Sequence, residues 1–132
     1  MAKHHSPRFV RLVEETTERI EEISAAGLKQ KLEGSGRFYL LDVREAEEYA
    51  VGRIPGAQHL CKGILERDIE ETVPDVNAEI VLYCGGGYRS ALAADNLQKM
   101  GYTRVHSLAG GWRGWVEAGF PTENPAQKRQ GS

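Results

Sequence analysis

The most constraining feature of this sequence is an abrupt change from strand to glycine loop to helix in its second half. Ile80–Tyr83 is a short run of apolar and aromatic residues, typical of a strand that is buried on both faces. Cys84 follows at once, then the three glycines Gly85–Gly87, and a helical pattern runs from about Tyr88 to Met100. A buried strand that leads directly into a helix favours an α/β fold, with helices on both faces of a parallel sheet.

Other segments continue this alternation. Further strands are predicted at 38–43, 57–60 and 105–108, and further helices at 7–19, 24–34, 45–50, 64–73 and 112–117. Ligand sites in such folds gather at the carboxyl ends of the strands, where Asp42, Cys84 and Gly110 lie. We expect an N-terminal helical extension over 1–19, one α/β domain over 20–120 and a polar, flexible tail over 121–132.

The N-terminal helix has a recognisable beginning. Ser6 offers a capping hydroxyl, and Pro7 suits the first helical position because its missing N–H would be unpaired there in any case. We expect this helix to pack against the domain as an appendage. A helix that docks a partner is the alternative.

Composition narrows the range of partners. The chain has 132 residues, of which 40% are hydrophobic and 27% charged, with a net charge of −2. Charges of both signs are interspersed, so neither nucleic acid nor a membrane is an expected partner, and no apolar run approaches the roughly 20 residues that span a bilayer. Cys61 and Cys84 form no disulfide framework, and the four histidines lack metal-ligand spacing. We expect no metal site and a reducing, cytoplasmic setting.

The glycine loop predicts a reactive cysteine. Glycines adopt positive φ and allow several backbone N–H groups to point into one cavity, where the helix N-terminus adds positive potential. Cys84 would lie in that field, with Arg89 as a nearby full positive charge. Such surroundings favour the thiolate, which is the nucleophilic form of cysteine. The alternative is an inert cysteine that packs as a small hydrophobic residue.

Several motifs recur in a fixed order around this loop. They are Leu41–Glu45 with Glu48 and Tyr49, Gly52–Ala57, Cys84–Ser90, and Leu108–Trp112 with Trp115. Together they cover about residues 20–120, and in this order the chain resembles the single-domain rhodanese-like sulfurtransferases. The resemblance implies a five-stranded parallel sheet with helices on both faces. It also implies that sulfane sulfur passes from thiosulfate or a persulfide donor to a thiol or cyanide acceptor through a Cys84 persulfide, without a cofactor.

The resemblance also suggests roles for individual residues. Cys84 would carry the sulfur, and Arg89 would assist anion binding and keep the cysteine ionised. The substrate-binding backbone would be that of Gly85, Gly86, Gly87, Tyr88 and Arg89. Ser90, Asp42, Arg44 and Arg53 would be supporting residues.

Two of the supporting assignments stay open. Asp42 and Arg44 could orient the loop or form a purely structural ion pair beside it. Arg53 replaces the histidine that is usual in the family's Gly-His-Ile-Pro-Gly-Ala motif, and a fixed positive charge cannot titrate near neutral pH. We therefore expect a structural role at this position.

The loop length separates related chemistries. Cys84 and Arg89 are separated by four residues, as in sulfurtransferases, whereas the related phosphatases and arsenate reductases have five and thus a wider ring of amides. Because the predicted loop carries only one charged side chain, it should admit donors less charged than thiosulfate, such as glutathione persulfide. A protein could also be the donor or acceptor.

A partner-dependent sulfur carrier and a non-catalytic binding module are the competing hypotheses to an enzyme. Cys61 is expected to be a lone thiol, with a relay role as the alternative.

Overall fold

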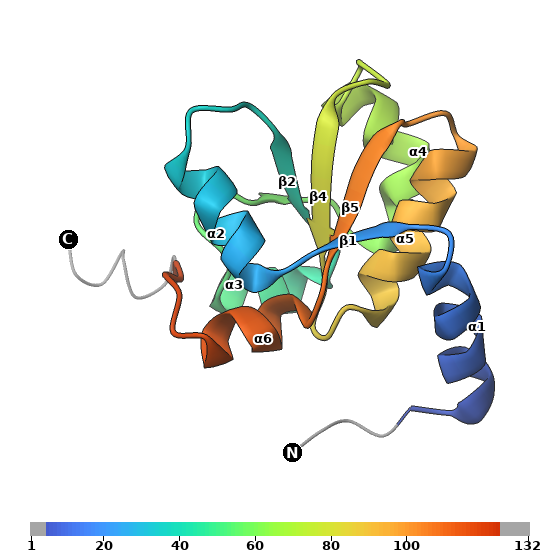
Figure 1. The fold of residues 1–132 in the computed structure, drawn as a ribbon, viewed down its shortest axis with the longest axis horizontal. Helices are drawn as coiled ribbons and strands as arrows, with labels where there is room; N and C mark the ends of the chain where they lie inside the picture. The colour runs from blue at the N-terminus through green and yellow to red at the C-terminus, as the bar shows by residue number, and fades with distance from the viewer. Residues whose placement is uncertain (1–4, 125–132) are drawn as a thin grey trace.

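The computed structural model of the protein describes residues 5–124. The helices are α1 (Pro7–Thr17), α2 (Ala25–Glu33), α3 (Ala46–Val51), α4 (Lys62–Thr72), α5 (Tyr88–Lys99) and α6 (Gly111–Glu117). The strands are β1 (Glu21–Ile23), β2 (Tyr39–Asp42), β3 (Gln58–His59), β4 (Glu79–Tyr83) and β5 (Arg104–Leu108). All strand pairs are parallel, and the order across the sheet is β1-β5-β4-β2-β3 (Figure 1). The five-stranded parallel sheet that the resemblance implied is confirmed.

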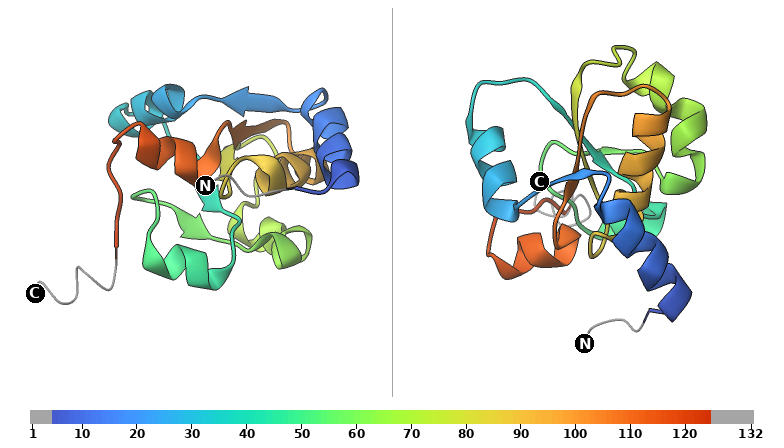
Figure 2. Two further views of the ribbon diagram at one scale, coloured as in Figure 1. Left: turned by 90° about the horizontal axis from the view of Figure 1, so that it is seen from below. Right: turned by 45° about the vertical axis from the view of Figure 1, so that its right-hand side comes forward.

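Helices cover both faces of the sheet (Figure 2). Side chains alternate along each strand, so neighbouring residues enter different cores. Leu41 and Leu82 belong to the core beneath α4 and α5, whereas Leu40 and Val81 belong to the core beneath α2 and α6. Trp115 of α6 is 1% exposed and fills the second core. The predicted two-faced burial of the central strands is therefore confirmed.

The strand register brings the predicted site residues to one edge of the sheet. β2 and β4 are neighbours, and Asp42 pairs with Tyr83 at their carboxyl ends. Cys84 therefore leaves the sheet beside the segment that carries Arg44. In a parallel sheet this edge also receives the N-termini of the following helices, here α3 and α5.

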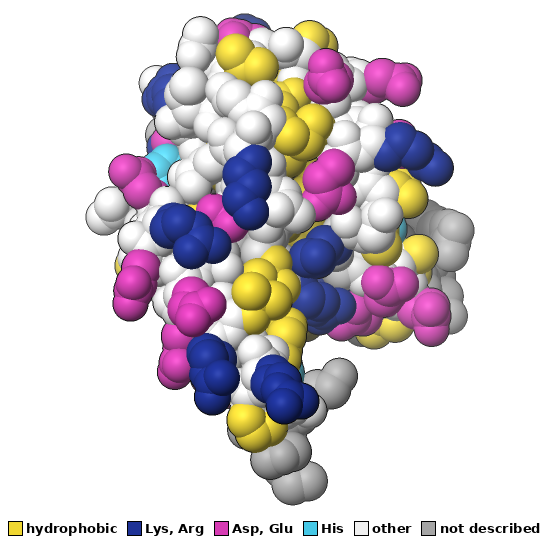
Figure 3. Space-filling view, turned by 90° about the vertical axis from the view of Figure 1, so that its right-hand side faces the viewer, with side chains coloured by type: hydrophobic (Ala, Val, Ile, Leu, Met, Phe, Trp, Pro, Cys, Tyr) yellow, Lys and Arg dark blue, Asp and Glu magenta, His cyan; other side chains and the backbone are white. Residues whose placement is uncertain are grey.

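Helix α1 packs on the outer side of α5. Val13 and Thr16 are buried in this contact, and Arg19 donates to the carboxylate of Asp95 with its Nη2 2.9 Å from Oδ2. Pro7 stands at the predicted first turn, but the Ser6 hydroxyl makes no capping hydrogen bond, so that part of the prediction is wrong. Figure 3 shows charged side chains of both signs, interspersed with small apolar groups, over the face that α1 and α5 form.

Some boundaries differ from the sequence-based predictions. The hydrophobic pattern of the sequence did not predict the strand at Glu21–Ile23, because this edge strand is three residues long and begins with two exposed glutamates. At the C-terminal end, Arg53 and Glu123 form an isolated antiparallel bridge with backbone hydrogen bonds of 2.9 and 2.8 Å. The remainder of the predicted flexible tail, 125–132, lies outside the described residues. Within 5–124, no helix combines the length and apolar character needed to cross a bilayer.

Candidate active site

The Cys84 sulfur lies at the bottom of the glycine loop. Sγ accepts hydrogen bonds from the backbone N–H of Gly87 at 3.1 Å and of Ser90 at 3.3 Å. Gly87 has φ +99°, a conformation that side chains rarely adopt, and this turn directs its N–H back toward the sulfur. Of the loop amides that the sequence predicted, at Gly85–Arg89, Gly87 donates directly to the sulfur, and the Ser90 N–H is a further donor outside that set.

Two serine hydroxyls extend the environment of the sulfur into the core. Ser90 Oγ lies 3.5 Å from Cys84 Sγ and 2.8 Å from Ser107 Oγ, and both serines are fully buried. Ser107 comes from β5, so this contact links the loop to the neighbouring strand. Ser90 was predicted from the sequence as a supporting residue, but Ser107 was not, because a lone serine within a strand gives no signal.

Arg89 does not stand as a free positive charge beside the sulfur. Its Nη1 and Nη2 lie 3.0 and 3.3 Å from the two carboxylate oxygens of Glu48 on α3. This hydrogen bond raises the pKa of Arg89. Partial burial would raise the pKa of Glu48, but the arginine and the Glu45 N–H outweigh burial and hold that pKa below its usual value. The pair carries no net charge, which the sequence analysis had not anticipated.

Asp42 and Arg44 form a buried ion pair behind the loop. Arg44 Nη2 lies 2.7 Å from Asp42 Oδ2 and 2.6 Å from the Gly52 carbonyl oxygen, and the Arg44 and Asp42 side chains are 3% and 0% exposed. Burial alone would lower the pKa of Arg44, but the hydrogen bond and attraction of Asp42 outweigh it and raise that pKa. The guanidinium also lies over the ring of Trp112 at 4.9 Å. No direct contact joins this pair to the Cys84 sulfur among the described residues, which agrees with a structural role beside the site.

Arg53 lies at a different place from the cysteine loop. Its guanidinium is 4.2 Å from the Tyr49 ring centre, and its Nε is 3.1 Å from Glu123 Oε2. It is not among the residues that surround Cys84. These contacts agree with the structural role that the sequence analysis expected at this position.

Helix α6 is fixed directly to the cysteine loop. The Trp112 N–H donates to the Cys84 carbonyl oxygen at 2.7 Å, and the Arg113 N–H donates to that of Gly85 at 3.0 Å. Gly111 makes the approach close enough that any side chain there would collide with the loop backbone, and its φ is +56°. The Arg113 guanidinium consequently lies against Gly86, where an added Cβ would overlap it. Sequence reasoning missed Arg113, although its place directly after Trp112 was a usable signal.

A pocket of about 380 Å³ opens above the sulfur. Its lining residues are His5, Phe9, Glu45, Glu48, Cys84, Gly86, Tyr88, Arg89 and Arg113. The first two come from the N-terminal extension: His5 stacks on the Tyr88 ring at 4.4 Å, and Phe9 lies 5.8 Å from the same ring. The extension is therefore part of the pocket wall as well as a packing appendage.

Cys61 stands apart from Cys84. It precedes α4 and follows the outer strand β3, and β2 separates that strand from β4. Its Sγ lies 3.4 Å from Glu45 Oε2, and both cysteines are free thiols. Two strand spacings of about 4.8 Å exceed the reach of a disulfide, so the structure gives no support to a relay.

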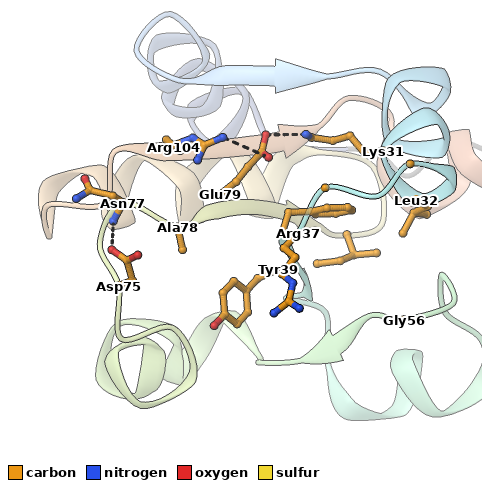
Figure 4. Close-up of a pocket in the computed structure, with 14 residues that line it drawn as sticks. Lys31, Leu32, Arg37, Tyr39, Gly56, Asp75, Asn77, Ala78, Glu79 and Arg104 are labelled. Atoms are coloured by element: carbon orange, nitrogen blue, oxygen red, sulfur yellow. Dashed lines mark hydrogen bonds and ion pairs between the residues drawn. The ribbon is translucent and has the colours of Figure 1, made fainter.

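A second pocket, of about 620 Å³, lies at the opposite edge of the sheet, where the strands begin. Figure 4 shows Lys31 and Arg104 both directed toward Glu79, at 2.8 and 3.5 Å. Arg37, which also lines this pocket, has no acidic partner among residues 5–124. The described lining of this pocket contains no cysteine, so the pocket above Cys84 is the candidate active site.

Comparison with known proteins agrees with this geometry. Residues 24–118 match the family described as "Rhodanese-like domain". YrkF of Bacillus subtilis, whose name provisionally describes a sulfur carrier protein, is 38% identical over 102 residues. That alignment covers 77% of this chain but only 54% of YrkF. A sulfurtransferase of Allochromatium vinosum is 34% identical over 106 residues, which cover 80% of this chain and 97% of that protein.

A solved structure from Rhodopseudomonas palustris extends the likeness to α1. It belongs to a protein of unknown function described as a possible tyrosine phosphatase, with 30% identity and a TM-score of 0.80. The superposition covers 93% of this chain and 99% of that one. The family match, the sulfurtransferase relative and the strand–cysteine–glycine–helix site lead to one conclusion: this chain is a member of the rhodanese-like domain family.

Proposed function

We propose that the protein is a sulfurtransferase that carries sulfane sulfur as a persulfide on Cys84. The observation that carries this proposal is the set of N–H groups around the sulfur. Gly87 and Ser90 already donate to Sγ, and the N–H groups of Gly85, Gly86, Tyr88 and Arg89 have no acceptor within residues 5–124. A persulfide has a second, anionic sulfur beyond the first, and these remaining donors are suited to receive it.

In the first half-reaction the Cys84 thiolate attacks the outer sulfur of the donor. With thiosulfate, a new sulfur–sulfur bond forms to Cys84 while the old one breaks, and sulfite leaves with the electron pair. With a low-molecular-weight persulfide, the leaving group is the thiolate of the donor. Arg89, held by Glu48, lies in the wall of the pocket that the donor enters.

In the second half-reaction an acceptor removes the outer sulfur. Cyanide attacks it and leaves as thiocyanate, while the electron pair of the broken bond returns to Cys84 as thiolate. A thiolate acceptor reacts in the same way and becomes a persulfide. The route needs no cofactor, and it needs Cys84 as a free thiol, which supports a reducing, cytoplasmic setting.

Phosphatase chemistry is the second candidate, because the Rhodopseudomonas palustris relative is described in that way. The loop argues against it. Only four residues separate Cys84 from Arg89, whereas the related phosphatases have five and thus a wider ring of amides that fits a tetrahedral phosphate. The shorter loop fits a single anionic sulfur better than it fits a phosphate group.

A partner-dependent carrier is the nearest rival to free turnover. YrkF is named for a sulfur carrier role, and such a protein would load Cys84 from a protein donor and pass the sulfur to a protein acceptor. The same persulfide forms in both cases. An enzyme transfers sulfur between small donors and acceptors, whereas a carrier needs its protein partners.

Intact-protein mass spectrometry after brief incubation with thiosulfate or glutathione persulfide tests the proposal. We expect one added sulfur, about 32 Da, that cyanide removes and that the Cys84→Ser variant does not acquire. The Cys61→Ser variant serves as the matched control and should load normally. If neither small donor loads the protein but a protein persulfide does, the function is that of a carrier. Loading on Cys61 in place of Cys84 would refute the proposal.

A further inference from the structure

We propose that Arg113 is a substrate-binding residue that receives the anionic group of the sulfur donor. This inference rests on the proposed function and names a determinant of specificity within the same pocket. Arg113 lines the pocket together with Cys84, and its guanidinium covers Gly86 of the cysteine loop. It has no acidic partner among the residues that the structure describes.

Arg113 and Arg89 differ in how far their positive charges are compensated, and this difference favours Arg113 as the residue that binds the anion. Arg89 is engaged by both carboxylate oxygens of Glu48, so most of its charge is compensated before a substrate arrives. Arg113 is the other arginine of the pocket, and its guanidinium is uncompensated within residues 5–124. An anion that enters would therefore gain more from Arg113 than from the arginine that the loop motif supplies.

The backbone fixes the base of Arg113 relative to the reacting sulfur. Its own N–H donates to the Gly85 carbonyl oxygen at 3.0 Å, and the N–H of Trp112 donates to that of Cys84 at 2.7 Å. The guanidinium lies near the position that a Cβ at Gly85 or Gly86 would take. The glycines thus leave space for a guanidinium above the loop, and larger residues there would displace it.

The acidic residues of the pocket lie on the side formed by α3 and the residue before it, and Arg113 lies on the side formed by α6. Glu48 lies on α3 and is already paired, and Glu45 precedes α3, with its carboxylate near the Cys61 thiol. The pocket therefore has an acidic side at α3 and a basic side at α6. A donor with a sulfonate or carboxylate close to its sulfane sulfur fits with that group toward Arg113. This modifies the expectation of less charged donors, which rested on the loop sequence alone.

Alkylation of Cys84 by iodoacetate and iodoacetamide tests the charge without any assumption about sulfur transfer. The two reagents have similar size, but only iodoacetate is an anion. In Arg113→Gln, the ratio of the iodoacetate rate to the iodoacetamide rate at Cys84 should fall about three- to tenfold. Site-resolved peptide mass spectrometry separates Cys84 from Cys61.

Arg37→Gln is the matched control. It removes the same charge from the pocket at the opposite edge of the sheet, and it should leave the ratio unchanged. Arg113→Lys keeps a positive charge and should retain most of the wild-type ratio. An unchanged ratio in Arg113→Gln, or an equal fall in Arg37→Gln, would overturn the inference.

Two further measurements keep the inference separate from the proposed function. In the wild-type protein, about 0.5 M NaCl should reduce the iodoacetate rate more than the iodoacetamide rate, which tests the charge even if Arg113→Gln does not fold. Where thiosulfate is turned over, Arg113→Gln should raise its KM about threefold or more with little change in kcat. If the alkylation ratio falls as expected in Arg113→Gln but the wild-type protein turns over no sulfur donor, Arg113 is an anion-binding residue and the sulfurtransferase proposal is rejected.

Discussion

The Arg89 guanidinium makes a two-pronged contact with the Glu48 carboxylate, at 3.0 and 3.3 Å, across the pocket wall between α5 and α3. The contact joins a residue of the cysteine loop to one that follows β2. It sets the orientation of Arg89 and removes most of its net charge from the pocket. Several of the expected properties of the protein depend on this pair.

Glu48→Gln should strengthen the binding of an anionic donor. The variant keeps an oxygen acceptor for the Glu45 N–H but leaves the charge of Arg89 uncompensated. We expect the KM for thiosulfate to fall about threefold, because one opposing unit charge is lost at short range. Steady-state kinetics at low ionic strength measure this, and a raised KM would show that orientation of Arg89 matters more than its charge.

The same pair predicts how stability depends on pH. The pKa of Glu48 is lowered in the folded protein, so its stabilising effect is fully present above the unfolded value of about 4.3 and is lost as pH falls through the folded value. Both side chains are about one-third exposed, at 38% for Glu48 and 35% for Arg89. Screening then limits the effect to about 0.5 kcal/mol. In urea unfolding, the difference between wild type and Glu48→Gln should be constant above about pH 5.5 and shrink below pH 4.

Arg44→Met should destabilise the fold strongly. The substitution leaves the Asp42 carboxylate buried without its partner, and a broken buried pair costs about 3–5 kcal/mol. Urea unfolding at pH 7 measures the change. Arg53→Gln is the comparison: its pair with Glu123 is partly exposed and should cost less than about 1 kcal/mol. Equal losses in the two variants would contradict the structural role assigned to the Asp42–Arg44 pair.

Ser90→Ala should slow the reaction of Cys84 with iodoacetamide. The Cys84 thiol donates to Ser90 Oγ at 3.5 Å, and once the cysteine is ionised the Ser90 hydroxyl becomes the donor to the thiolate. Loss of one hydrogen bond to a charged group should lower the rate about five- to tenfold. Ser107→Ala removes the other half of the hydroxyl pair but keeps the Ser90 donor, so the rate should stay near that of wild type. Ser90→Ala at the wild-type rate would exclude this hydroxyl from activation of the cysteine.

Phe9→Ala should open the pocket on the side of α1. Phe9 is half-buried and lies against the Tyr88 ring, so its loss removes part of the wall and about 1 kcal/mol of stability. Alkylation of Cys84 by a bulky maleimide should become faster relative to iodoacetamide. Leu12→Ala, on the exposed side of the same helix, should leave this ratio unchanged. An unchanged ratio in Phe9→Ala would mean that α1 does not limit access to the sulfur.

The sequence by itself determined the central architecture and the place of Cys84 between a buried strand and a glycine loop. Ile80–Tyr83 is apolar enough to specify a buried strand, and three glycines before a helix have few uses other than a tight, amide-lined loop. These are local signals, because strand burial and positive φ depend on residues that are adjacent in the chain. The family resemblance that the surrounding motifs carry then implied the five-stranded sheet as a whole.

Only the tertiary structure decided the charge and shape of the pocket. Glu48, Arg113 and Phe9 lie 36, 29 and 75 positions from Cys84 in the printed sequence, and the fold brings them to one cavity. Nothing local shows that Glu48 neutralises Arg89 or that Arg113 lies above Gly86, because these contacts depend on how α3 and α6 pack beside the loop. The edge strand β1 was missed for a related reason: its three residues are held by their partner β5 and not by their own hydrophobicity. Local propensity thus specified where the Cys84 sulfur lies in the fold, whereas long-range packing specified what surrounds it.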